Sequence, residues 1–155
     1  MVHSAGLLFA EQAQRDKTYD LTGKQAQHRV DSSQVAEKLQ QVSSEKSSFL
    51  TSIFQAMSAV RAEMSKIRDM ANDTKLAQLN DKLEELEAKR YAMEAQLKNL
   101  EEKFKADAKR IDDTYQQEKT KLEMEIKTLD AQIETQRKLR DDYIKKTYQF
   151  RINNG

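Results

Sequence analysis

The 155-residue sequence contains no cysteine, no proline and no tryptophan, and it contains only three glycines. Without cysteine the chain has no disulfide framework and no thiolate metal site. Glycine and proline are poor residues for a helix interior, and together they usually make up about 12% of a sequence. The stretch 24–154 contains neither of them. We therefore predict an all-α protein with long coiled-coil helices, arranged as an elongated helical hairpin with a short N-terminal helix.

Long apolar runs are also missing, since the longest covers only Leu7–Ala10. A transmembrane helix needs about 20 predominantly apolar residues, so we expect no transmembrane segment. The N-terminus lacks the cationic start and apolar core of a secretory signal. We expect a protein that is cytoplasmic or exported without a classical signal peptide.

The charges are balanced, with 27 basic and 26 acidic residues and a net charge of +1. A nucleic-acid-binding surface usually requires a clear excess of basic residues, so we expect no nucleic-acid partner. Interspersed charges of both signs are typical of solvent-exposed helix faces.

We divide the chain into three segments. Segment 1–23 is predicted to be a short amphipathic helix followed by a turn over 18–23, where Asp20 and Gly23 favour turns. Segment 24–71 is predicted to be the first long helix, with a possible kink at the serine-rich 43–48. Segment 72–155 is predicted to be a long coiled-coil helix with a C-terminal docking end.

The breaks between helices depend on local signals. Asn72, Asp73 and Thr74 all favour helix starts or turns, and we place the hairpin break there; the alternative is an uninterrupted helix. A second candidate break lies at 112–114, where Asp112, Asp113 and Thr114 could begin a new helix. If residues 75–150 form one helix, it spans about 114 Å.

Apolar residues recur every three or four positions along most of the chain, which indicates helices with one apolar seam. In the first long helix these residues include Val35, Leu39, Val42, Ile53, Met57, Val60 and Ile67. In the second, the residues expected to form the helix-packing or oligomer interface are Leu76, Leu79, Leu83, Leu86, Met93, Leu97, Leu100, Phe104, Ile111, Leu122, Ile126, Leu129 and Ile133.

Burial of one such side chain stabilises a protein by about 1.5–3 kcal/mol, so the seam requires a partner helix. The segments 24–71 and 75–150 differ in length and cannot cover each other fully. We expect the unmatched part to bind another copy, giving a homo-oligomer or filament, or to bind another helical protein.

Both ends of the chain carry apolar side chains that we interpret as possible docking ends. They are Leu7, Leu8, Phe9, Tyr143, Tyr148 and Phe150. Because Lys145, Lys146 and Arg151 lie among the C-terminal aromatics, contact with a membrane or nucleic acid is an alternative. Docking on a neighbouring subunit is the simpler interpretation.

The residues that usually carry catalysis are sparse or scattered. The only histidines are His3 and His28, and the many carboxylates fit a solvated charged surface. We therefore predict no catalytic residue, no metal site and no cofactor, and we expect that the protein is not an enzyme. We predict a structural coiled-coil protein that self-associates, such as a filament or sheath subunit. The alternative is an adaptor, escort or stalk protein, for example in a bacterial export apparatus.

Overall fold

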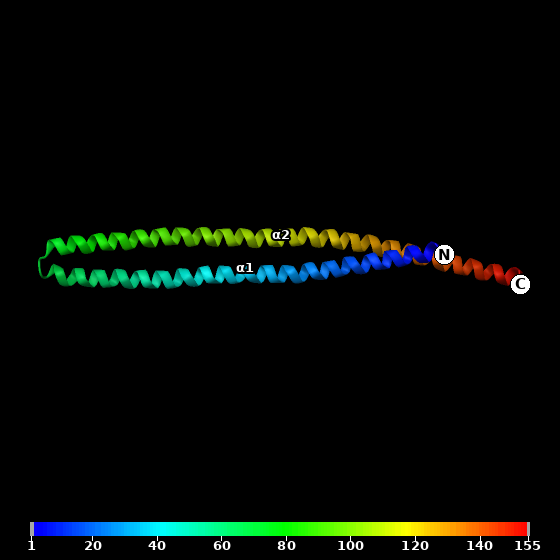
Figure 1. The fold of residues 1–155 in the computed structure, drawn as a ribbon, viewed down its shortest axis with the longest axis horizontal. Helices are drawn as coiled ribbons and strands as arrows, with labels where there is room; N and C mark the ends of the chain where they lie inside the picture. Colours follow the sequence, from blue (N-terminus) through cyan, green and yellow to red (C-terminus); the bar gives the residue numbers. More distant parts are fainter. Residues whose placement is uncertain (1, 155) are drawn as a thin grey trace. The chain divides into compact units, whose positions relative to one another are not determined.

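The computed structural model describes residues 2–154, with side chains described for 5–153. It contains two α-helices, α1 over Val2–Arg68 and α2 over Asp73–Asn154 (Figure 1). No strand occurs among the described residues. The predicted all-α helical hairpin is thereby confirmed. None of the described helices is long and apolar enough to cross a membrane.

The turn between the helices lies where the sequence predicts a break. Ala71 adopts a positive φ of 51°, which bends the chain away from the axis of α1. The side-chain oxygen of Asn72 accepts a hydrogen bond of 3.3 Å from the backbone N–H of Lys75, and it thereby caps the start of α2. Asp73 in the first turn adds a negative charge that favours the helix N-terminus.

The predicted turn over 18–23 is wrong, because α1 is helical there, and α1 also continues without a break through 43–48. The short N-terminal helix is therefore the beginning of α1. The hydroxyls of Thr18 and Thr22 donate hydrogen bonds to the carbonyls of Gln14 and Thr18, at 2.8 and 3.1 Å. These bonds span four residues and are compatible with a helix, so the threonines do not stop it.

The candidate break at 112–114 is also absent, since α2 is helical there. Asp112 contacts His28 of α1, with 3.1 Å between the carboxylate oxygen Oδ1 and the ring nitrogen Nε2. Pairing with α1 thus continues through a stretch whose local sequence would allow a new helix to begin.

The chain divides into two compact units, in each of which a part of α1 packs against a part of α2. The first unit combines the described residues of 1–31 with those of 111–155, and the second comprises 32–110. Leu7, Ala10 and Ile133 form a buried cluster in the first unit. Val60, Ile67 and Leu79 form one in the second.

This arrangement corrects the length argument made from the sequence. Segment 1–23 is predicted from the sequence to be separate from the two long helices, but in the structure it packs against α2 within the first unit. The helices to compare therefore have 67 and 82 residues, so the excess of α2 over its intramolecular partner is much smaller than predicted.

Candidate interaction surfaces

The predicted seam of α2 faces inward for most of its length. Leu79, Leu97 and Ile133 are buried, and Leu100 is exposed. The remaining predicted seam residues are half-buried, namely Leu76, Leu83, Leu86, Met93, Phe104, Ile111, Leu122, Ile126 and Leu129. Half-burial is expected where one neighbouring helix covers a side chain from one side only.

Where contacts are described, the partner of the seam is α1 of the same chain. Leu79 packs with Val60 and Ile67, and Leu76 and Leu83 pack against this cluster. Most of the buried core residues belong to α1, and their spacing of three and four residues in the sequence predicts them. They include Val35, Val42, Ile53, Met57, Val60 and Ile67.

A ladder of polar contacts joins the helices in the first unit. Lys17 pairs with Glu125 at 3.0 Å, and Lys24 pairs with Glu118 at 3.2 Å. These pairs lie seven residues apart on both helices, as flanking charges do in an antiparallel coiled coil. The sequence alone does not predict these pairs, because charge spacing along one helix does not identify the opposite residue.

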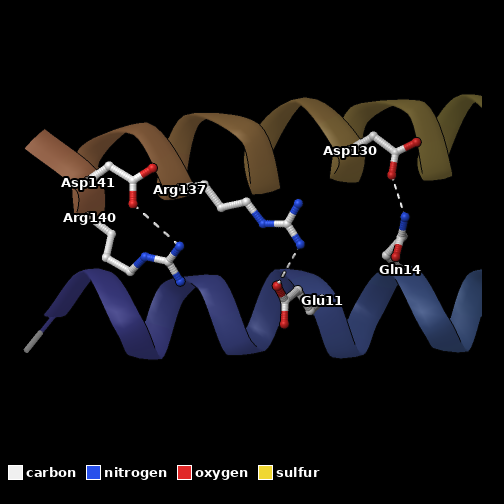
Figure 2. Close-up of polar contacts among 6 residues, drawn as sticks. All are labelled: Glu11, Gln14, Asp130, Arg137, Arg140 and Asp141. Carbon is white, nitrogen blue, oxygen red and sulfur yellow. Dashed lines mark hydrogen bonds and ion pairs between the residues drawn. The ribbon is translucent and has the colours of Figure 1, made fainter.

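Further along the same unit the charges are reversed between the helices. Glu11 of α1 accepts a hydrogen bond of 3.2 Å from the guanidinium of Arg137 of α2. Gln14 likewise donates its amide to the carboxylate of Asp130. Figure 2 shows both contacts reaching from one helix to the other. A shift in register would place several of these groups opposite the wrong partner, so the ladder favours one alignment of the unit.

The ion pairs change the protonation equilibria of a few groups. The hydrogen bond and the charge of Glu125 raise the pKa of Lys17 above its ordinary value. In the second unit, Lys105 lowers the pKa of Glu101 through a hydrogen bond and its charge, and the charge of Lys46 on α1 adds to this effect. These shifts stabilise the ionised forms that make the pairs.

His28 lies between the helices in a mixed polar and aromatic contact. Its ring stacks on Tyr115 with 4.0 Å between centroids, and its Nε2 contacts Asp112. Among the residues that the structure describes, no group of three or more His, Asp or Glu residues could hold a metal ion. The side chain of His3, the other histidine, lies outside the described ones.

The six residues of the predicted docking ends differ in their exposure to solvent. Leu7 is buried against Ile133, so its assignment as a docking residue is wrong; the reason is that the N-terminal segment belongs to the helix pair. The other five, Leu8, Phe9, Tyr143, Tyr148 and Phe150, are all more than half exposed. Ile144 and Ile152 at the C-terminal end are exposed as well.

Comparison with known proteins finds no relative of this chain. No protein-family model, curated protein or solved structure matches the chain.

Proposed function

We propose that the protein is a structural coiled-coil subunit that self-associates through helix packing, building a larger assembly such as a filament or sheath. The observation that carries this proposal is the amount of large apolar surface outside the intramolecular cores. Among the described residues, fifteen large apolar side chains are exposed, whereas eleven hydrophobic residues are buried. Single exposed apolar residues are ordinary in proteins, but six of these fifteen lie within 139–152, and a cluster of exposed apolar residues favours a partner surface.

The half-buried seam supports the same proposal. A pair of helices covers each seam residue from one side, and a further helix can remove the remaining surface from water. Each Å² of apolar area buried in this way contributes about 25 cal/mol. Association of two or more hairpins would thus add to the stability of the seam without changing the pairing inside each unit.

The proposal is tested by measuring the size of the purified chain over a wide concentration range. Sedimentation velocity should show species larger than the monomer, and negative-stain microscopy at high concentration should show regular assemblies. A chain that stays a monodisperse monomer throughout would overturn the proposal. That result would favour an adaptor or escort that binds a different helical protein.

A further inference from the structure

The C-terminal part of α2, residues 141–154, carries an apolar stripe that the described chain leaves uncovered. Tyr143, Ile144, Tyr148, Phe150 and Ile152 are between 58% and 67% exposed. Ile144, Tyr148 and Ile152 recur every four residues and therefore lie along one face of the helix. With 3.6 residues per turn, Tyr143 and Phe150 fall on the opposite face, together with the polar Lys146 and Asn153. The apolar stripe of this segment therefore consists of Ile144, Tyr148 and Ile152, and it is exposed among the described residues.

The charges on this face are arranged so that the segment complements itself. Asp141, Ile144, Tyr148 and Arg151 follow one another at intervals of three, four and three residues. This is the spacing of a helix-packing seam, with an acid at one end, a base at the other and two apolar residues between them. Asp141 contacts its chain neighbour Arg140 at a long 3.5 Å (Figure 2), and its side chain is exposed.

We propose that residues 141–154 form an antiparallel helix pair with the same segment of a second copy of the chain. Ile144 then faces Tyr148 of the second copy, and Asp141 faces Arg151 of the second copy. A two-fold axis repeats each of these contacts. This inference rests on the self-association proposed above and names the surface through which it begins.

The charge pattern decides between the two possible directions of pairing. In a parallel pair, Asp141 would face Asp141 of the second copy and Arg151 would face Arg151, so like charges would repel at both ends. In the antiparallel pair, both ends carry opposite charges.

A charge-swap series tests the pairing. Arg151→Asp should raise the dimer dissociation constant about tenfold, equivalent to about 1.4 kcal/mol, because it places two acids opposite each other at both ends. Asp141→Arg should do the same with two bases. The double variant Asp141→Arg with Arg151→Asp should return the constant to near the wild-type value, and a mixture of the two single variants should associate. Sedimentation equilibrium measures all four cases.

The lack of cysteine in the chain allows a second, independent measurement. An oxidised mixture of an Ile144→Cys chain and a Tyr148→Cys chain should give far more disulfide-linked dimer than either chain alone. Parallel pairing would reverse this result, because each cysteine would then meet its own counterpart.

The possible failures are distinguishable. If the wild-type chain is monomeric at every concentration, both the proposed self-association and the proposed antiparallel pairing of residues 141–154 are wrong. If the wild-type chain associates but the charge variants have the same dissociation constant, only the antiparallel pairing of residues 141–154 is wrong. If a monomeric wild-type chain binds phosphatidylserine vesicles and Ile144→Asp abolishes the binding, the stripe contacts a lipid surface and not a second copy.

Discussion

Gly23 occupies an exposed position in the interior of α1, where glycine is an unfavourable choice. A Cβ atom added there would meet no heavy atom within 4 Å. We expect Gly23→Ala to raise the free energy of unfolding by about 0.5–1 kcal/mol, because alanine loses less backbone entropy on entering a helix. Urea unfolding followed by circular dichroism at 222 nm measures the change.

Gly6 provides the matched control, since it lies in the same helix but next to α2. A Cβ atom at this position would lie 3.3 Å from the Cδ and Oε1 atoms of Gln136. Gly6→Ala should therefore gain less than Gly23→Ala, because the Gln136 side chain must move. A loss of stability in Gly23→Ala would show that residues 18–23 form the turn predicted from the sequence rather than part of the helix.

Residue-level exposure was only partly predictable from the sequence. The spacing of three and four residues correctly indicated that Leu79, Leu97 and Ile133 face inward. It could not indicate that Leu7 is buried while the adjacent Leu8 and Phe9 are exposed, because all three are apolar and contiguous. That distinction depends on which side of α1 faces Ile133, and hence on the pairing of distant segments.

At the scale of the helices, the turn between α1 and α2 contains a strained residue. Ala71 has a φ of 51°, in the left-handed region that disfavours any residue with a Cβ atom. We expect Ala71→Gly to stabilise the hairpin by about 1 kcal/mol, since glycine adopts this conformation without a steric penalty. The midpoint of urea unfolding should shift to a higher concentration.

The same substitution inside a helix should have the opposite effect. Ala92 is an exposed residue within α2, and Ala92→Gly should cost about 1 kcal/mol of unfolding free energy. If Ala71→Gly destabilised the protein as much as Ala92→Gly does, the left-handed conformation in the turn would be wrong.

The boundaries of the helices show when local sequence is sufficient. The turn at 69–72 was predictable because Asn72 caps the next helix through a side chain only three residues from its partner. The predicted turn at 18–23 failed because contacts from elsewhere support the helix there. Lys17 and Lys24 flank this stretch, and each pairs with a glutamate of α2. Those partners are about a hundred residues away in the sequence, where local propensity carries no information.

For the molecule as a whole, the two units differ in what joins their helices. Among the described residues, the first has three ion pairs between α1 and α2 and a contact between His28 and Asp112. In the second, the helices meet through an apolar cluster and through the cation–π contacts of Lys38 with Phe104 and of Arg90 with Phe54. The sequence indicated the apolar seams of both helices but not the ion pairs between them. Those pairs follow from which residues of α1 lie opposite which residues of α2. The chemical contrast predicts different responses to salt.

We expect 1 M sodium chloride to loosen the first unit selectively. The Debye length falls to about 3 Å, and exposed ion pairs are largely screened. Ion pairs within single helices should contribute equally to the salt response of the two units, because both units contain them. Within the part of the chain that the structure describes, each unit has two lysine–glutamate pairs of this kind. They are Lys119–Glu123 and Lys138–Glu134 in the first, and Lys89–Glu85 and Lys105–Glu101 in the second.

Amide hydrogen exchange at neutral pH, measured in 0.05 M and 1 M sodium chloride, resolves the two units in one experiment. The opening free energy of amides in 11–28 and 112–137 should fall in 1 M sodium chloride, since the two units differ in the ion pairs between their helices. Amides around the Val60, Ile67 and Leu79 cluster should keep their protection, because salt does not weaken apolar burial. Equal losses in both units would mean that the ladder of charges does not hold the first unit together, and that its few buried apolar residues suffice.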